Sequence, residues 1–412
     1  MIDLSFCVST FTDTHLACRY VYWNLSFRSH LGERVPQLRF PGFDGEWQPV
    51  LLKNILHERK TYAEKDGSYP HATLSKEGIY GKTDRYDRDF LVSTENKEYK
   101  ITLKNDLCYN PANLKFGVIC LNTFGSAIFS PIYVTFEIDK AYSPEFVGAS
   151  LTQKDFIRYA LRFQEGTVYE RMAVSPEDML SISRRFPSIA EQTKIAQFVS
   201  LIDSRIADQR KLVELLKKHK RGLLRDVFEE NIEGDCYSFS EIASRRNEKI
   251  APTKDSRLDC IELEHIEQET GMLLGSVPLS GQNSLKNLCK PSDIVFGKLR
   301  PYLRKFVFAE NECAVSSETW VLVAAKGIYP KFLFYLIQSE PFMRAASVSS
   351  GTKMPRSEWS NVANAKFYVP DRTQQETIAA CFSEIDRRIL ASQRILTAAQ
   401  AYKRGLLQQL FV

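Results

Sequence analysis

The chain contains one long segment twice, and this repeat restricts the folds open to it. A shift of 183 positions places residues 187–228 on residues 370–411 without a gap. The recurring residues of the first copy are Gln192, Ile195, Ala196, Ser200, Ile202, Asp203, Arg205, Ile206 and the Lys-Arg-Gly-Leu-Leu run from Lys220; those of the second copy are Gln375, Ile378, Ala379, Ser383, Ile385, Asp386, Arg388, Ile389 and the same run from Lys403. A self-match over so long a period indicates a molecule built from two similar halves.

Both copies place apolar residues at alternating steps of three and four, the pattern of an amphipathic helix that packs on another helix. The predicted helix-pair seam consists of Ile195, Val199, Ile202, Ile206, Val213 and Leu216 in the first copy and Ile378, Phe382, Ile385, Ile389 and Leu396 in the second. Polar residues occupy the same two seam positions in each copy, Gln209 and Lys220 or Ser392 and Lys403. Because such residues can set helix register, we expect the copies to pair as an antiparallel coiled coil. A zipper between two chains is the alternative.

Composition is ordinary for a globular protein. The net charge of +5 permits a polyanionic partner without requiring one. The nine cysteines show no C-x-x-C spacing, which favours reduced thiols in a cytoplasmic protein over a disulfide framework or a zinc site. No apolar run approaches the ~18 residues of a membrane-spanning helix. Residues 1–34 do not have the pattern of a signal peptide and have no counterpart in the second half, so we treat them as an extension of unclear role.

A second internal match, at an offset of 187, relates the segments that precede the two helices. Asp106 and Tyr109 fall on Asp293 and Phe296. Separately from this offset, a weaker echo has each half reach an apolar turn and then a basic residue, Arg59 or Arg245, which we align with each other. The stretches around them are short, rich in β-branched and aromatic residues, and separated by Pro, Gly and Asn turns, which predicts strands. The expected architecture is a duplicated α/β (α+β) fold. Its predicted parts are the extension 1–34, a globule at 35–186, a spacer helix at 187–229, a second globule at 230–369 and a second spacer helix at 370–412.

The sequence shows no motif for catalysis. It contains no G-x-G-x-x-G after a strand, no G-x-x-x-x-G-K-[ST] and no H-E-x-x-H. The segment from Asn110 to Asn113 partly matches the Asn-Pro-Pro-aromatic motif of amino-methyltransferases. It lacks the second proline and the aromatic residue, so an Asn-Pro turn is the better interpretation. The histidines are dispersed, and neither a catalytic residue nor a metal site is predicted.

Basic residues mixed with aromatic residues and turn formers indicate candidate DNA-binding sites in both halves. Arginine and lysine can neutralise phosphates, and an arginine fork can meet O6 and N7 of guanine. The candidates in the second half are Lys298, Arg300, Tyr302, Arg304, Lys305, Ser350, Gly351, Thr352, Lys353 and Arg356. Those in the first half are Asn110, Asn113, Lys115, Gly166, Thr167, Tyr169 and Arg171. The alternative for each group is a solvated basic surface or an ordinary turn.

These motifs together resemble the specificity subunit of type I restriction-modification systems. The residues that carry the resemblance are the repeated P-x(4)-Q-x-x-I-A, I-D-x-R-I and K-R-G-L-L segments, DIVFGKLRPYLRK from Asp293 and LRFPGFDGEW from Leu38. The resemblance implies two target recognition domains, each binding one half of a bipartite sequence in double-stranded DNA. It also implies that the paired helices set the spacer and bind two modification subunits. The chain itself would then be non-catalytic and without a cofactor.

By the same resemblance, the modification subunits would hold S-adenosylmethionine and methylate adenine, and two restriction subunits would add Mg²⁺- and ATP-dependent translocation and cleavage. Exposed charges on the helices, expected at Asp203, Arg205, Asp386 and Arg388, are candidate contacts for such partners or simply a solvated face. Two other functions stay open as alternatives: a stand-alone DNA methyltransferase or nuclease, and a coiled-coil scaffold without a nucleic acid partner.

Overall fold

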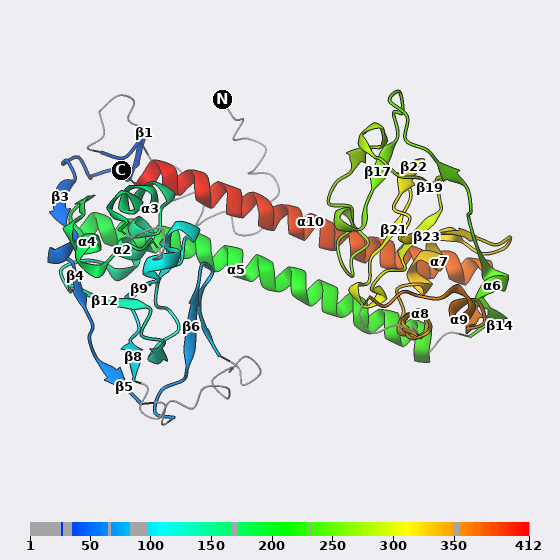
Figure 1. Ribbon diagram of the computed structural model, residues 1–412, viewed down its shortest axis with the longest axis horizontal. Helices are drawn as coiled ribbons and strands as arrows, with labels where there is room; N and C mark the ends of the chain where they lie inside the picture. The colour runs from blue at the N-terminus through cyan, green and yellow to red at the C-terminus, as the bar shows by residue number, and fades with distance from the viewer. Residues whose placement is uncertain are drawn as a thin grey trace. The chain divides into compact units, whose positions relative to one another are not determined.

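The computed structural model describes residues 26–27, 35–64, 67–82, 98–165, 172–230, 233–348 and 354–411. The chain divides into two compact units. Unit 1 comprises Met1–Ala207 together with Thr397–Val412, and unit 2 comprises Asp208–Leu396. Helix α5 (Ile189–Arg225) and helix α10 (Arg372–Leu410) each contribute one part to each unit (Figure 1).

Each unit contains a four-stranded antiparallel sheet with the same strand order. In unit 1 the order is β10 (Ile119–Leu121), β9 (Leu107–Tyr109), β12 (Val134–Ile138) and β4 (Leu56–Glu58). In unit 2 it is β21 (Phe306–Phe308), β20 (Ile294–Gly297), β23 (Thr319–Ala324) and β15 (Ala243–Arg245). Tyr109 pairs with Ile119 and Val134, and Phe296 pairs with Phe306 and Trp320. Matched residues of the two units are therefore 187 positions apart in the chain up to Ile119, and 186 positions apart from Val134 onward.

A second sheet is also shared, with two additional strands in unit 2. Unit 1 has β11 (Ala127–Phe129), β8 (Tyr99–Thr102) and β5 (Tyr62–Ala63) in that order. The matching strands of unit 2 are β22 (Cys313–Val315), β19 (Lys286–Cys289) and β16 (Lys249–Ile250), and β17 (Asp259–Ile261) and β18 (Val277–Pro278) extend the sheet beyond β22. Between β5 and β8, unit 1 has the hairpin of β6 (Ala72–Ser75) and β7 (Gly78–Gly81) instead. The units thus share a frame and differ in the segment between two matched strands.

A short two-stranded ladder leads into each long helix. In unit 1, β13 (Ser183–Phe186) pairs with β3 (Gln48–Leu51), and in unit 2, β24 (Lys366–Val369) pairs with β14 (Asp235–Ser238). Pro187 and Pro370 follow these strands, and a proline cannot continue the ladder because it has no N–H to donate. In the N-terminal part, β1 (Ser26–Phe27) pairs with β2 (Leu38–Arg39).

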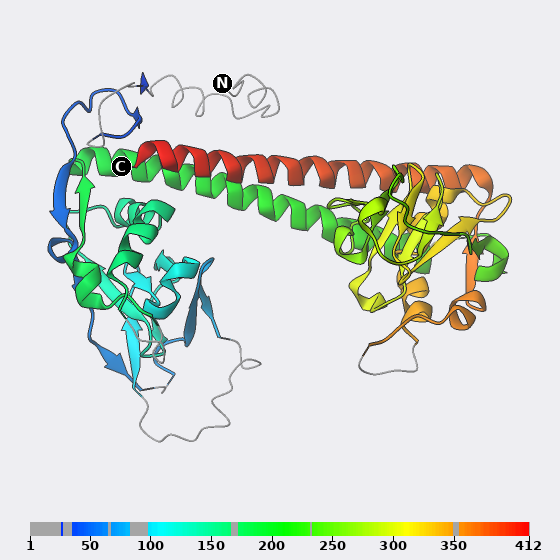
Figure 2. The same ribbon diagram turned by 45° about the horizontal axis from the view of Figure 1, so that its top comes forward.

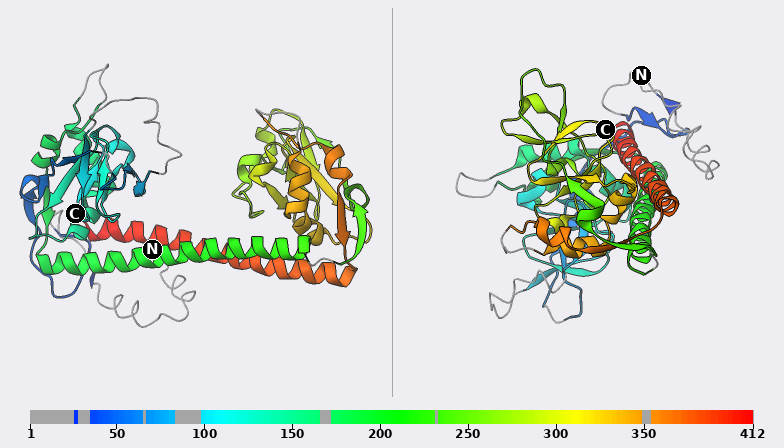
Figure 3. Two further views of the ribbon diagram at one scale, coloured as in Figure 1. Left: turned by 90° about the horizontal axis from the view of Figure 1, so that it is seen from below. Right: turned by 90° about the vertical axis from the view of Figure 1, so that its right-hand side faces the viewer.

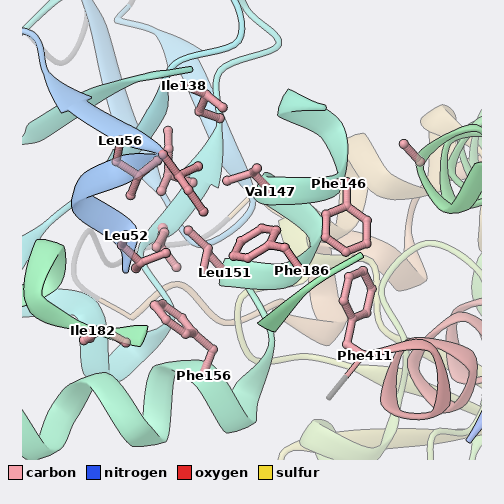
Figure 4. Packing of buried hydrophobic residues seen from close by; sticks show 14 of the residues in the cluster. Leu52, Leu56, Ile138, Phe146, Val147, Leu151, Phe156, Ile182, Phe186 and Phe411 are labelled. Carbon is pink, nitrogen blue, oxygen red and sulfur yellow. The ribbon is translucent and has the colours of Figure 1, made fainter. Parts of the chain in front are cut away.

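The core of unit 1 is closed by the end of α10. Helices α2 (Pro144–Leu151), α3 (Lys154–Ala160) and α4 (Pro176–Ser181) pack beside the sheet and supply buried side chains such as Phe146 and Phe156. Phe411 follows α10 and lies with its ring centroid 5.2 Å from that of Phe146 (Figure 4). Leu406 and Leu410 belong to the same buried cluster. Residues from both ends of the described chain therefore share one core.

The core of unit 2 repeats this arrangement with different residues. Its helices are α6 (Phe239–Ile242), α7 (Pro330–Leu336), α8 (Glu340–Ser347) and α9 (Trp359–Ala363), and α7 and α8 lie against the sheet (Figure 3). Phe228 occupies the position of the repeat that Phe411 occupies in unit 1. Its ring lies 5.6 Å from that of Phe332 and 6.3 Å from that of Phe382.

Within each unit, α5 and α10 pack antiparallel. In unit 2, Gln209 Nε2 donates to the Ser392 carbonyl at 3.0 Å and Lys220 Nζ lies 2.7 Å from Asp386 Oδ1, so the partner on α10 has a lower number as α5 advances. In unit 1, the last turns of α10 lie beside the first turns of α5 (Figure 2), and Lys403 Nζ donates to Asp203 Oδ1 at 2.5 Å. The expected duplicated fold, with two mixed globules and two long antiparallel helices, is confirmed.

Every residue of the predicted seam is shielded from solvent to some degree. The buried members are Ile195, Val199, Ile206, Val213, Phe382 and Ile389, and the half-buried members are Ile202, Leu216, Ile378, Ile385 and Leu396. Some of them pack into a globule as well as along the helices, since Ile195 and Val199 belong to the core of unit 1 and Phe382 to that of unit 2. The apolar stripe therefore also attaches each helix to its globule.

Candidate nucleic-acid interface

A buried glutamine fixes the start of each long helix to its globule. Gln192 accepts a hydrogen bond from the Ser143 backbone N–H at 3.1 Å and donates to the Pro187 carbonyl at 2.9 Å. Gln375 accepts from the Tyr329 N–H at 2.8 Å and donates to the Pro370 carbonyl at 2.9 Å. Ser143 and Tyr329 are the N-cap residues of the matched helices α2 and α7. The equal spacing of Pro and Gln in the two copies of the repeat thus has a structural cause.

A bidentate ion pair fixes the turn before the central strand in each unit. Arg59 contacts both carboxylate oxygens of Asp106 at 2.9 and 3.0 Å, and Arg246 contacts both of Asp293 at 2.6 and 3.0 Å. Each aspartate also accepts a backbone N–H three residues earlier, at 2.7 Å in unit 1 and 2.8 Å in unit 2. The alignment of Arg59 with Arg245 was therefore wrong by one residue: Arg246 is the counterpart, and Arg245 lies over the Trp359 ring at 4.7 Å.

These anchors position two matched turns, which we call turn 1 (residues 110–118) and turn 2 (residues 298–305). Turn 1 connects β9 to β10 and contains the 3₁₀-helix Pro111–Phe116, and turn 2 connects β20 to β21 and contains the 3₁₀-helix Pro301–Leu303. Gly117 N donates to the Leu114 carbonyl at 2.8 Å, and Arg304 N donates to the Pro301 carbonyl at 2.8 Å at the equivalent place. Both closing residues have positive φ, 80° for Gly117 and 49° for Arg304. The turns are thus two versions of one structure.

Turn 1 shows why an Asn-Pro pair stands at its start. The Asn110 side chain accepts the backbone N–H of Ala112 at 3.1 Å and of Asn113 at 3.2 Å, which caps the short helix. Asn110 is buried, so its side chain supports the turn and is not presented to a ligand. The interpretation of this segment as an Asn-Pro turn is confirmed, and Asn113 lies half-buried in it. Lys115 is exposed at the tip, with Nζ 5.2 Å from the centroid of the Phe116 ring.

Turn 2 is held in a strained conformation at both ends. Arg300 and Arg304 have left-handed backbone angles, with φ of 52° and 49°, which L-residues with a side chain adopt at an energetic cost. Backbone bonds hold the first end in place: Lys298 N donates to the Glu318 carbonyl at 3.0 Å and Arg300 N to the Pro355 carbonyl at 2.8 Å. The surrounding chain therefore fixes this shape, which places Arg300 and Tyr302 at the surface.

Each turn presents one cation and one aromatic ring to solvent. Phe116 is 65% exposed in turn 1, and Tyr302 is 59% exposed in turn 2. The sequence prediction included Tyr302 but missed Phe116. The signal was present, because an aromatic residue beside Lys115 in a turn rich in Pro and Asn has no apolar periodicity that would assign it to a core. Exposed aromatic and basic side chains together can stack on bases and neutralise phosphates.

Three of the predicted basic residues instead make contacts inside unit 2. The Arg304 guanidinium pairs with Glu340 and also donates to the Gln338 carbonyl at 3.5 Å. Lys305 Nζ donates to the Leu263 carbonyl at 2.5 Å. Arg356 contacts both carboxylate oxygens of Glu318 at 3.0 and 3.3 Å, and this hydrogen-bonded pair lowers the pKa of Glu318. Lys298 is half-buried.

The remaining predicted residues lie outside the described part of the chain. They are Gly166, Thr167, Tyr169 and Arg171 in the first half and Ser350, Gly351, Thr352 and Lys353 in the second. In chain order, the two groups fall within 166–171 and 349–353, between described segments.

Two of the helix charges expected at the surface bind the opposite helix. Asp386 Oδ1 lies 2.7 Å from Lys220 Nζ, and Asp386 Oδ2 accepts a hydrogen bond from the Tyr335 hydroxyl at 3.0 Å. Asp203 forms an ion pair with Lys403. Burial lowers the pKa of Lys220, and the Asp386 carboxylate opposes part of that shift. Arg205 and Arg388 are exposed, as expected, although Arg388 pairs with Glu384 at 3.0 Å. The expectation of four outward charges was therefore wrong for Asp386, which is half-buried, whereas Asp203 is exposed although it pairs with Lys403.

Neither a metal centre nor a membrane span is found within the described ranges. Their His, Cys, Asp and Glu side chains form no group of three or more that could hold a metal ion. None of their helices combines the length and apolar character needed to cross a bilayer.

Comparison with known proteins finds similarity to specificity subunits of type I restriction enzymes. The chain is 22% identical over 415 residues to the type I restriction enzyme MjaVIII specificity subunit of Methanocaldococcus jannaschii, covering 89% of this chain and 91% of that protein. It is 27% identical over 135 residues to the HindI specificity subunit of Haemophilus influenzae, covering 31% of this chain and 29% of that protein. No protein-family model matches the chain.

Solved structures extend the similarity to the fold. The S subunit of the type I restriction-modification system from M. genitalium superposes with a TM-score of 0.56 at 15% identity, covering 92% of this chain and 99% of that one. A second chain, from a structural study of assembly and conformational transition in a type I system, gives a TM-score of 0.51 at 16% identity, covering 89% and 96%. Because the sequence identity is low, these superpositions show a similarity of fold.

Proposed function

Because the chain is a specificity subunit of the type I restriction-modification family, we propose that each unit recognises one half of a bipartite DNA sequence through turn 1 or turn 2. In this role the chain binds the target sequence in DNA and does not itself carry out methylation or cleavage. We assign target recognition domains to residues 35–186 and 230–369, and spacer helices to residues 187–229 and 370–412. The proposal locates the protein in the cytoplasm, where it meets its DNA.

The observation that carries this proposal is that the two units share their sheets and anchoring contacts but differ in the side chains that turn 1 and turn 2 expose. The sheets, the Arg–Asp pairs and the Gln contacts are the same in both units, so they cannot distinguish two different half-sites. Turn 1 presents Lys115 and Phe116, whereas turn 2 presents Arg300 and Tyr302, and the offset of 187 places Lys115 on Tyr302 and Asn113 on Arg300. Surface side chains that differ on a common scaffold are the natural source of different specificities.

The chemistry of these side chains fits double-stranded DNA. The Arg300 guanidinium can bind O6 and N7 of a guanine, and Lys115 offers a single charge suited to a phosphate. Tyr302 and Phe116 can contact a thymine methyl group or a partly opened base step. The preset backbone of turn 2 lowers the entropic cost of binding, since the loop does not have to be ordered on DNA.

We further propose that the helices bind two modification subunits, which supply S-adenosylmethionine and methylate adenine. Two restriction subunits then add Mg²⁺- and ATP-dependent cleavage. Apolar residues on the outer side of α5 support such a docking role, since Leu212 and Leu215 in unit 2 are 44% and 53% exposed. Exposed leucines on a helix whose seam already faces another helix are typical of a protein interface.

The length of the helices is proposed to set the spacer between the half-sites. One heptad inserted into both helices, after Ala207 and after Leu396, leaves the described contacts within each unit untouched because both points lie at the boundary between the units. The methylated sequence should then show a longer spacer with unchanged half-sites. Retention of the original spacer would exclude this role for the helices.

The central test is to co-express the chain with its modification partner and map the methylated adenines across the genome. The expected result is one bipartite motif with two unlike halves. Lys115→Ala with Phe116→Ala should relax one half, and Arg300→Ala with Tyr302→Ala the other. Binding should weaken steeply with salt, because phosphate contacts release counterions. Methylation without a bipartite motif, or catalysis by the isolated chain, would contradict the proposal.

A further inference from the structure

Turn 2 is connected to the helix pair of unit 2 by a second segment, residues 267–270, which we call the connecting turn. On one side it contacts both helices. Glu267 lies 3.6 Å from Lys217 Nζ on α5 and accepts Gln393 Nε2 of α10 at 3.1 Å. Glu269 accepts Arg221 Nη1 of α5 at 2.9 Å. Two carboxylates thus bind the connecting turn to two helices at three points.

On its other side the connecting turn is bonded to turn 2. The backbone N–H of Glu269 donates to the Arg304 carbonyl at 2.9 Å. Arg304 is the residue with left-handed backbone angles that closes turn 2, and its side chain pairs with Glu340 at the start of α8. The path from helix to turn 2 therefore contains only one intervening residue, Glu269.

The connecting turn has little freedom to move. Glu269 has a φ of 64°, so its backbone is held in a conformation that the surroundings must impose. Thr270 is buried and its hydroxyl donates to Glu267 at 2.6 Å. Gly271 has a φ of 74°, and a Cβ there would lie 2.8 Å from the Phe334 ring. The turn is packed against the aromatic core of unit 2 in one conformation.

Polar contacts and apolar packing meet at the junction between the connecting turn and the helices. A small cavity of about 20 Å³ lies here, lined in part by Lys217, Lys220, Arg221, Arg304 and Gln338. That volume fits about one water molecule. The buried Gln338, which lines this cavity, has no hydrogen-bond partner for its Oε1 within the described chain.

Unit 1 has no equivalent connection in its described part. Gly117 stands in the place of Arg304 at the end of turn 1, and its carbonyl accepts the Ile119 N–H of the same hairpin at 2.9 Å, where the Arg304 carbonyl accepts Glu269 of the connecting turn. The repeat counterpart of Arg221 is Arg404, which is exposed and forms no ion pair with a residue of the described ranges. The two units therefore share a turn but differ in how it is fixed.

We propose that Glu267 and Glu269 are positioning residues for turn 2, so that contacts on the helices control recognition of one half-site and leave the other unaffected. This inference rests on the proposed function, because it requires that turn 2 binds DNA. It extends that function by making the two half-sites unequal in their dependence on the helices. Through Glu269, a displacement of α5 at Arg221 is transmitted to the backbone of Arg304.

The test uses the full chain in complex with its modification partner and measures affinity for duplexes in which one half-site at a time is randomised. Arg300→Ala with Tyr302→Ala first identifies the half-site that depends on turn 2. Glu269→Arg places two cations together and should lower affinity for that half-site about tenfold, with the other half-site changed less than about twofold. The double variant Glu269→Arg with Arg221→Glu restores the pair with reversed charges and should recover most of the loss.

Two further variants separate positioning from general destabilisation. Arg404→Ala is the matched change at the repeat position in unit 1 and should leave both half-sites unchanged. Glu269→Gly keeps the left-handed backbone but removes the carboxylate, so it should lose discrimination without lowering thermal stability. Equal losses at both half-sites, or no recovery in the double variant, would overturn the inference. If the unmodified complex shows no sequence preference, the proposed function itself fails, and the two outcomes are distinguishable.

Discussion

The same ion pair occurs once in each unit and is exposed in one but buried in the other. In unit 1, Lys403 and Asp203 have side-chain exposures of 26% and 50%. In unit 2, the repeat counterparts Lys220 and Asp386 have exposures of 4% and 24%. The difference comes from Tyr335 of α7, whose ring lies 5.4 Å from Lys220 Nζ and whose hydroxyl donates to Asp386. The same lysine and aspartate of the repeat therefore form ion pairs of different burial, because different globules cover them.

The largest effect is expected where the units agree. Phe228→Ala and Phe411→Ala should each lower the free energy of unfolding of their own unit by about 3–5 kcal/mol, because each removes a buried ring from an aromatic cluster. Urea denaturation followed by hydrogen exchange and mass spectrometry resolves the two units. Phe116→Ala is the control, with little effect expected because its ring is exposed. Loss of protection in unit 2 alone for Phe411→Ala would contradict the assignment of the chain end to unit 1.

The next largest effect is expected from removing the aspartate of the repeated ion pair, and it should differ between the units. Asp386→Ala leaves Lys220 buried without its carboxylate and is expected to cost about 3 kcal/mol. Asp203→Ala breaks an exposed pair and is expected to cost less than about 1 kcal/mol. The same unfolding experiment measures both. Lys220→Met with Asp386→Leu should recover most of the stability, since an apolar pair can replace a buried ion pair. Equal costs for the two alanine variants would refute the role of Tyr335.

A smaller and equal effect is expected for the buried glutamines. Gln192→Leu and Gln375→Leu each leave an N-cap amide without its acceptor, at a cost of about 1–3 kcal/mol. Thermal unfolding gives the size of both changes. Gln197→Leu, at an exposed position of the same helix, is the control. A difference of more than ~1 kcal/mol between the two would mean that the frames of the units are less alike than their hydrogen bonds indicate.

The smallest expected effect is a dependence on pH confined to unit 2. Burial lowers the pKa of Lys220 in the folded state below the ordinary value of 10.5. The folded protein therefore binds this proton less tightly, and its stability rises as pH increases from the folded pKa toward 10.5. Subtracting the pH profile of Lys220→Met from that of the unmodified chain isolates the contribution. If this contribution to the free energy of unfolding instead fell as pH rises over this range, the Asp386 carboxylate would raise the pKa of Lys220 more than burial lowers it.

The helix pair and the duplicated fold could be predicted because their signals are periodic and long. Gaps of three and four residues recur along both copies, and the offset of 183 holds without interruption. The register of the globules was harder to predict, because a one-residue change falls between Ile119 and Val134 and neighbouring arginines compete for the match. The observed pairing with Asp293 identifies Arg246 as the counterpart of Arg59, in agreement with the offset of 187 in this part of the chain.

The DNA-binding candidates were predictable as segments but not as individual side chains. Lys298, Arg300, Arg304 and Lys305 are equally basic in the sequence, yet Arg304 pairs with Glu340 and Lys305 with the Leu263 carbonyl. Those partners lie 36 and 42 residues away along the chain, so local sequence does not identify them. Turn chemistry was more informative, because the capping role of Asn110 depends only on residues within three positions.

The presence of residues 397–411 in unit 1 has a consequence for protein synthesis. A ribosome makes these residues after all of unit 2, although Leu406, Leu410 and Phe411 complete the core that the earliest described strands begin. Domains usually mature in the order of translation. Here the nascent chain must hold its first globule open, with Trp47 and Phe146 uncovered on one side, until translation reaches the end of α10.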